Sequence, residues 1–130
     1  MGRPIHFEIY VKDMERAKKF YSNTFGWTFE DYSEYVGAPY FGVITGEESE
    51  PGINGALTLG EDSNNDNKIF CGSVLTIGVE DYDTIEKKIL ESGGKVQSPK
   101  YPLLGMAWQG YYLDTEENIF GIHQPDENAK

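Results

Sequence analysis

A histidine and a carboxylate lie two residues apart near the start of the chain, in the segment PIHFEIYVKD (residues 4–13). Alternate residues of an extended strand share one face, so His6, Glu8 and Tyr10 would point to the same side of a strand. Imidazole and carboxylate groups can bind a metal ion, and Glu8 is a candidate general base if desolvation raises its pKa toward neutrality. Alternatively, Glu8 is hydrogen-bonded to neighbouring strands or water, and both groups sit at a wet rim.

A second histidine, His123, lies in the segment NIFGIHQ (residues 118–124). His6, Glu8 and His123 together would form a set of two histidines and one carboxylate, which suits non-haem iron. The alternative is a histidine that pairs with backbone or water near the end of the last strand. Cys71 is the only cysteine, which excludes an internal disulfide and, within one chain, a thiolate metal cluster.

The charge of the chain limits its partners. The 130 residues include 11 lysines and arginines against 22 aspartates and glutamates, a net charge of −11. Such a field repels phosphate backbones and anionic lipid head groups, so we expect no nucleic-acid and no membrane partner. A neutral or cationic small molecule is favoured instead. No stretch approaches the ~18 to 20 apolar residues of a membrane span and the start lacks a secretion signal, so we expect a cytoplasmic protein.

The chain repeats itself at an offset of 68 residues. The matching residues are Ile9, Val11, Asp13, Lys19, Gly26, Gly37 and Gly42, which align with Ile77, Val79, Asp81, Lys87, Gly94, Gly105 and Gly110. In each half an apolar strand, residues 6–11 or 74–79, precedes an amphipathic helix, residues 14–25 or 82–93. The repeat therefore predicts two modules of the same construction.

Caps and turns set the limits of these elements. Asp13 and Asp81 stand where a side chain can cap the first amides of each helix, and Gly26 and Gly94 stand where a left-handed residue ends it. Three short strands follow each helix, at residues 27–32, 40–44 and 55–60, and at 95–98, 107–113 and 118–124. The acidic segments 45–55 and 59–68 are predicted loops, and Pro102 and Gly105 suggest a connection, or a flexible lip, before the strand at 107–113.

The predicted fold is α+β, with two tandem βαβββ modules at about residues 4–60 and 72–125 of a single domain, residues 1–130. Neither module can cover its sheet alone, so two side by side would curl their mixed sheets around a shared cup with the helices outside. Ligands favour such concave, partly apolar places. The candidate ligand-binding residues are His6, Glu8, Tyr10, Thr76, Trp108 and His123.

The segments HFEIYVKDMERAKKFYSNTFGW, VEDYDTIEKKILESGGKV and DTEENIFGIHQ resemble the vicinal oxygen chelate superfamily, which includes glyoxalase I, bleomycin-resistance proteins and extradiol dioxygenases. The resemblance spans essentially the whole chain. It implies the fold described above and a homodimer. In the metal-dependent members it also implies four ligands, one at the start of the first strand and one on the last strand of each module.

Only His6 stands at such a ligand position here. Its partner at the offset of 68 is Val74, the position seven residues beyond Asp114 is Gly121, and none of residues 54–59 is a carboxylate or a histidine. A divalent ion held by one imidazole would be weak, because catalytic sites normally need about three protein ligands. We therefore expect no metal cofactor, with a divalent ion such as Zn, Ni, Fe or Mn as the alternative.

Two functions of different class follow. The first is a metal-free protein that binds a small neutral or cationic organic molecule in the cup, similar to drug-sequestering bleomycin-resistance relatives. The alternative is a metal-dependent lyase, isomerase or dioxygenase in which His6 binds the ion with non-standard ligands. Glutathione-dependent chemistry is disfavoured, because recognition of an anionic tripeptide usually recruits arginines and the chain has only Arg3 and Arg16.

Overall fold

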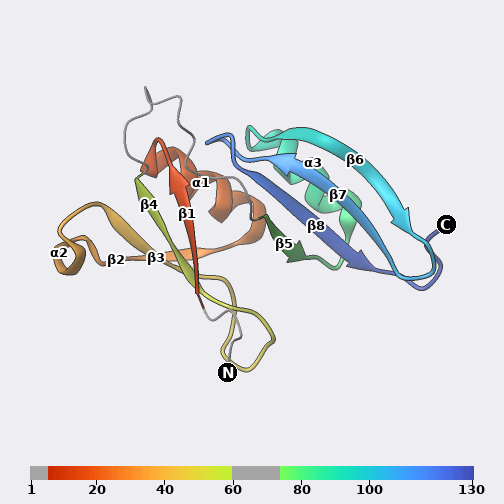
Figure 1. Cartoon of the computed structure of the whole chain (residues 1–130), viewed down its shortest axis with the longest axis horizontal. Coiled ribbons are helices and arrows are strands. Elements are labelled where there is room, and N and C mark those ends of the chain that lie inside the picture. Colours follow the sequence, from red (N-terminus) through yellow and green to blue (C-terminus); the bar gives the residue numbers. More distant parts are fainter. Residues whose placement is uncertain (1–5, 60–73) are drawn as a thin grey trace. The chain divides into compact units, whose positions relative to one another are not determined.

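The computed structural model describes residues 6–59 and 74–130. The chain divides into two compact units, residues 1–65 and 66–130. Most of the predicted loop at residues 59–68, and Cys71, lie outside the described residues. The cup formed by both modules, and a single domain made of them, stay predictions, while the construction of each unit is described in Figure 1.

The first unit contains one four-stranded sheet and one long helix. Its elements are β1 (Phe7–Val11), α1 (Met14–Phe25), β2 (Thr28–Asp31), α2 (Ser33–Val36), β3 (Tyr40–Ile44) and β4 (Gly55–Leu59). The strand order is β1-β4-β3-β2, with β1 and β4 parallel and the other pairs antiparallel. This is the predicted βαβββ module with one short additional helix.

The second unit repeats this topology. Its elements are β5 (Leu75–Gly78), α3 (Tyr82–Glu91), β6 (Lys95–Leu103), β7 (Ala107–Leu113) and β8 (Ile119–Pro125). The strand order β5-β8-β7-β6 again has one parallel pair, β5 with β8, and two antiparallel pairs. Two mixed sheets of equivalent order confirm the predicted α+β fold of two βαβββ modules.

Both helix starts are capped as predicted. The Asp13 carboxylate accepts a hydrogen bond from the Arg16 amide at 3.1 Å, and the Asp81 carboxylate accepts one from the Thr84 amide at 3.2 Å. Gly26 ends α1 with a φ of 77°. The prediction for Gly94 is wrong, because Gly93 has the positive φ of 98° at the end of α3. Gly94 is buried instead, and a Cβ atom there would lie 2.6 Å from the side chain of Ile89.

The core of the first unit lies between α1 and one face of its sheet. Ala17, Phe20 and Tyr21 of α1 are buried, and so are Val11 and Leu57 of the sheet. Trp27, just after the helix, stacks on Tyr21 with 4.8 Å between ring centroids. The apolar stripe of α1 thus covers one sheet face, and the opposite face carries the polar residues of β1.

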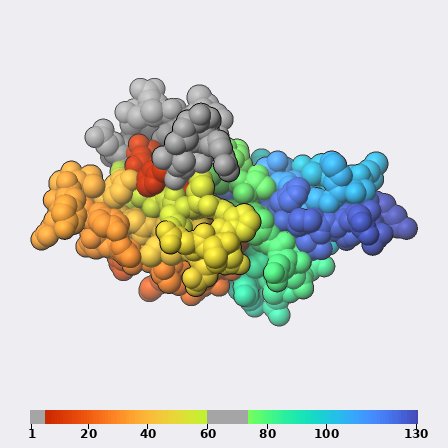
Figure 2. All heavy atoms as spheres, turned by 90° about the horizontal axis from the view of Figure 1, so that it is seen from below, coloured from red at the N-terminus to blue at the C-terminus, as the bar shows by residue number. Residues whose placement is uncertain are grey.

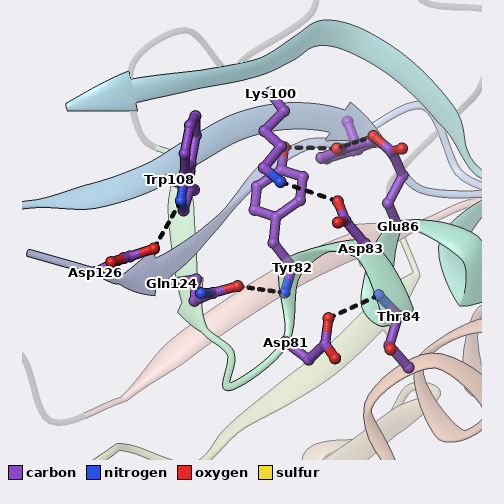
Figure 3. A network of polar contacts seen from close by, with 10 residues as sticks. Asp81, Tyr82, Asp83, Thr84, Glu86, Lys100, Trp108, Gln124 and Asp126 are labelled. Atoms are coloured by element: carbon purple, nitrogen blue, oxygen red, sulfur yellow. Dashed lines mark hydrogen bonds and ion pairs between the residues drawn. The ribbon is translucent and has the colours of Figure 1, made fainter. Parts of the chain in front are cut away.

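The core of the second unit contains a buried chain of polar contacts between α3 and its sheet (Figure 3). The hydroxyls of Tyr82 and Tyr112 lie 2.6 Å apart, and Tyr112 donates to the Glu86 carboxylate at 2.5 Å. Burial, together with the bond to Glu86, raises the pKa of the Tyr112 hydroxyl. Gly110 makes room for this chain, because a Cβ atom there would collide with the Tyr82 hydroxyl.

Two strands differ from the prediction. The strand predicted at residues 27–32 ends at Asp31, and the short helix α2 follows, ending at Gly37 with a φ of 84°. Figure 2 shows α2 (orange) on the surface of the first unit, where Tyr35 is 87% exposed. Because α2 buries none of its residues, the sequence has no apolar periodicity that would predict this helix.

The other difference concerns the segment read as a connection or lip before β7. Strand β6 runs to Leu103 and includes Pro102, so only a tight turn separates it from β7. Proline is tolerated there because β6 is an edge strand of its sheet. The turn is fixed by hydrogen bonds from the Gly105 amide to the Ala129 carbonyl and from the Met106 amide to the Leu103 carbonyl. None of the helices in the described part of the chain is long and apolar enough to cross a membrane.

Candidate functional site

The sheet face opposite α1 gathers the polar residues of the first unit, and we call it the first polar face. Strand alternation sends Ile9 and Val11 to the core and leaves His6, Glu8 and Tyr10 on the other side, as predicted. Pairing then places further residues on that face. Across the sheet, one row contains Glu8, Ala56, Gly42 and Glu30, and the next contains Tyr10, Thr58 and Tyr40.

Tyr40 joins the two predicted polar residues of β1. Its hydroxyl donates to the Glu8 carboxylate at 2.7 Å and lies 3.1 Å from Nε2 of His6. His6 Nε2 and the Glu8 carboxylate are themselves 3.8 Å apart. The hydrogen bond to Glu8, with partial burial, raises the pKa of Tyr40 to about 12. Because β4 separates β1 from β3, the Tyr40 side chain must reach across that strand.

A second carboxylate on the first polar face has the same kind of partner. The Tyr32 hydroxyl donates to the Glu30 carboxylate at 2.5 Å, and this bond raises the pKa of Tyr32. The Tyr32 ring lies over Gly42, where a Cβ atom would be 2.6 Å from it. The face therefore presents two carboxylates, each bound to a tyrosine, with the small residues Ala56 and Gly42 between them in the row.

Among residues 6–59 and 74–130, no lysine or arginine forms an ion pair with the Glu8 carboxylate. Within the described residues its partners are Tyr40 and His6. The Glu8 side chain is 40% exposed and the His6 side chain 49% exposed. This exposure does not provide the desolvation that a general-base role would require, so that role stays a prediction. A charged carboxylate among tyrosine rings is instead suited to attract a cation.

The second unit has an equivalent surface on the sheet face opposite α3, which we call the second polar face. Pairing brings Thr76, Gly121 and His123 to it, together with Gln109 of β7. His123 Nδ1 lies 2.7 Å from Oε1 of Gln109. Gln109 is only 4% exposed, so a buried amide holds the histidine ring in place.

Trp108 does not share that surface. It pairs with Gln124, one residue out of phase with Gln109 and His123, so its side chain points to the α3 side of the sheet. There its indole donates to the Asp126 carboxylate at 3.0 Å, and Nζ of Lys100 lies 4.7 Å from the ring centroid. Figure 3 shows these side chains beside Tyr82 and Asp83. The structure thus separates Trp108 from Thr76 and His123, with which the sequence had grouped it.

The described residues at the implied ligand positions do not fit a metal site. The side chains of Val74 and Gly121 provide no atom that could bind a metal ion. In the first unit, Ala56 of β4 is equivalent to Gly121 of β8, because Ala56 pairs with Glu8 as Gly121 pairs with Thr76. A side chain at Gly121 would also have to displace the Gln109 amide, since its Cβ atom would lie 2.9 Å from Nε2 of Gln109. Among residues 6–59 and 74–130, no three His, Cys, Asp or Glu side chains form a group that could hold a metal ion.

The structure also shows a hollow that the sequence did not suggest. It lies between α1 and β2, on the side of the sheet opposite the first polar face, with a volume of about 550 Å³. Its lining includes Lys18, Asp31 and Phe41. Nζ of Lys18 lies 4.0 Å from the centroid of the Phe41 ring and 2.9 Å from the Glu15 carboxylate. The lysine charge is therefore paired, and the lysine covers the Phe41 ring. The first polar face is therefore the better candidate site.

Two residues of the polar faces were missed by sequence reasoning as hydrogen-bonding partners. Neither Tyr40 nor Gln109 is among the candidate ligand-binding residues predicted from the sequence. Each lies on the third strand of its module and contacts a residue that is 14 to 34 positions away in the sequence. Alternation within a strand signals which face each residue takes, but their partners depend on the order of the strands.

Comparisons with known proteins agree with this architecture. Residues 3–119 match the family model described as the Glyoxalase/Bleomycin resistance protein/Dioxygenase superfamily. No curated protein sequence matches the chain. Among solved structures, the fosfomycin resistance protein FosX from Mesorhizobium loti is similar, with 17% identity, a TM-score of 0.67, and coverage of 95% of this chain and 92% of that one.

A glyoxalase/bleomycin resistance protein/dioxygenase family enzyme from Burkholderia phytofirmans PsJN has 19% identity and a TM-score of 0.69, covering 92% of this chain and 95% of that one. A glyoxalase-related enzyme from Fulvimarina pelagi has 16% identity and a TM-score of 0.69, covering 95% and 88%. At these identities the similarity concerns the fold alone. Because the family model matches most of this chain, the chain belongs to the glyoxalase/bleomycin resistance protein/dioxygenase superfamily.

Proposed function

We propose that this protein binds a small neutral or cationic organic molecule on its first polar face, without a metal ion. The observation that carries the proposal is the Glu8 carboxylate, which is exposed and fixed by the Tyr40 hydroxyl at 2.7 Å. A fixed carboxylate beside aromatic rings attracts an organic cation through both its charge and the ring faces. The net charge of −11 adds long-range attraction for the same ligands.

Three further features support a binding role. Glu30 supplies a second carboxylate bound to a tyrosine in the same row of the sheet. Tyr10, 40% exposed, adds another aromatic ring on the same face. His6 alone, among the residues at the implied ligand positions, does not suit a metal-dependent lyase, isomerase or dioxygenase. A cytoplasmic homodimer, with small-molecule binding of the bleomycin-resistance kind, completes the proposal.

The proposal is tested by thermal shift and calorimetry with aromatic amines and cationic glycopeptides. We expect at least one of these probes to raise the melting temperature, while anionic molecules of similar size do not. In Glu8→Gln, which keeps the shape but removes the charge, affinity for that probe should fall about tenfold, or ~1.4 kcal/mol.

Glu80→Gln is the matched control. It also removes one charge, from an exposed carboxylate just after β5 in the second unit, and should leave the affinity unchanged. If no cationic or neutral probe raises the melting temperature, or if both variants lose affinity equally, the first polar face is not the binding site.

A further inference from the structure

His123 and Gln109 form a hydrogen-bonded pair on adjacent strands, and they lie directly opposite each other in the register of β7 and β8. The ring atom Nδ1 lies 2.7 Å from the carbonyl oxygen Oε1 of the amide. An amide oxygen can only accept, so the proton of the neutral imidazole is on Nδ1 and Nε2 keeps its lone pair. The pair therefore presents an acceptor nitrogen on the histidine.

Packing explains why the amide holds this orientation. Gln109 is 4% exposed, and its amide nitrogen leans over Gly121, 2.9 Å from the place of a Cβ atom there. The Tyr111 ring borders the same point, also at 2.9 Å. A glycine at residue 121 thus gives the amide its space, at the position where the metal-dependent relatives are expected to have a ligand.

The place next to the histidine on β5, in contrast, carries no side chain. The neighbour there is Gly78, and a Cβ atom at Gly78 would meet nothing within 4 Å. Tyr101 pairs with Gln109 and Tyr111 pairs with Gly121, so aromatic rings lie on the same face beside the pair. An acceptor nitrogen, an adjoining space and flanking rings are complementary to an aromatic molecule with a hydrogen-bond donor.

We propose that His123 and Gln109 form a ligand-binding subsite of the second polar face, in which Gln109 is a positioning residue and Nε2 of His123 accepts a hydrogen bond from an aromatic O–H or N–H group. The subsite deepens the proposed small-molecule function and, as a place where a ligand binds, rests on it. Gln109 acts through the histidine, because it fixes the tautomer that the ligand meets.

The tautomer is measured without a ligand by nitrogen-15 NMR of the histidine side chains at pH 8, where an ordinary imidazole is neutral. The chain has only two histidines, so His6 is an internal reference in every spectrum. We expect the wild-type protein to carry the proton of His123 on Nδ1. Gln109→Leu should move it toward Nε2, and Gln109→Glu, which keeps an acceptor oxygen, should retain it on Nδ1.

Ligand contact is tested with phenol and anisole, which have the same ring but differ in the O–H donor. Phenol should shift the Nε2 resonance of His123 in wild type and less in Gln109→Leu, while anisole should leave it unchanged. A wild-type proton on Nε2, an unchanged tautomer in Gln109→Leu, or equal effects of phenol and anisole would each overturn the subsite. Failure of cation binding at Glu8 would leave these readouts unaffected, so the two proposals can fail separately.

Discussion

The amide nitrogen of Gln109 lies 2.9 Å from the point where a side chain at Gly121 would begin. The Gln109 side chain thus occupies the space beside Gly121 that a larger residue at position 121 would need. At the equivalent place in the first unit, Ala56 lies in the row next to Tyr40, whose hydroxyl reaches Glu8. In both units a side chain from the third strand forms a hydrogen bond across the sheet, near a position where the family resemblance implies a metal ligand.

The close packing around Gly121 predicts that alanine substitution at two glycines of one sheet face will differ in its effect on stability. Gly121→Ala should destabilise the protein by about 1 to 3 kcal/mol, because the new methyl group overpacks Gln109 and Tyr111. Gly78→Ala is the control, since open space surrounds it and its effect should be near zero. Urea denaturation of both variants measures the free energy of unfolding. Equal stability of the two variants would contradict the packing described here.

The Glu8–Tyr40 hydrogen bond predicts a change at alkaline pH. The pKa of Tyr40 is raised from its ordinary value of 10.0 to about 12, so the folded state keeps a proton that the unfolded state loses. The contribution of Tyr40 to the free energy of unfolding should therefore be complete below pH 10 and be lost as the pH rises through about 12.

This loss should disappear in Tyr40→Phe. Spectroscopic titration of tyrosinate should show one tyrosine fewer in the highest pH range for Glu8→Ala than for wild type. Glu80→Ala should titrate as wild type does. An unchanged titration of Glu8→Ala would show that Glu8 does not govern the ionisation of Tyr40.

The small number of metal-binding side chains near His6 predicts a low metal content of the purified protein. Protein purified without a tag and without chelators should contain well under one mole of Ni, Zn, Fe, Mn or Co per chain, also after incubation with these ions and desalting. His6→Ala should not change this content, because one imidazole with a nearby carboxylate offers fewer donors than the roughly three that a catalytic site needs. About one metal ion per chain, lost in His6→Ala, would instead support the metal-dependent alternative.

The helix caps predict two independent stability losses. Asp13→Ala and Asp81→Ala should each lower the free energy of unfolding by about 1 kcal/mol, because each carboxylate accepts a backbone hydrogen bond in the first turn of its helix. Their effects should add, since the two caps belong to helices of different units. Asp→Asn at either position keeps an acceptor oxygen and should cost less. Urea denaturation would refute the assignment if Asn and Ala had equal effects.

Local features of this protein could be predicted from its sequence. Asp13 and Asp81 cap helices because a cap depends on residues three positions away. His6, Glu8 and Tyr10 share a face because alternation is a property of a single strand. The offset of 68 residues predicted two equivalent modules because each module folds around its own helix. Where the local signal was weak, as in the exposed helix α2 and the proline-containing strand β6, the prediction was wrong or incomplete.

Only the tertiary structure decided which residues meet. Tyr40 reaches Glu8 because β4 lies between β1 and β3, an order that the chain reaches only by a long-range parallel pairing. Gln109 meets His123, and Trp108 takes the opposite face, because of the register between β7 and β8. A shift of one residue in that register would exchange these faces. The sequence thus determined the elements and their polar sides, whereas strand order and register, set by packing over the whole unit, determined the hydrogen-bonded pairs of the candidate sites.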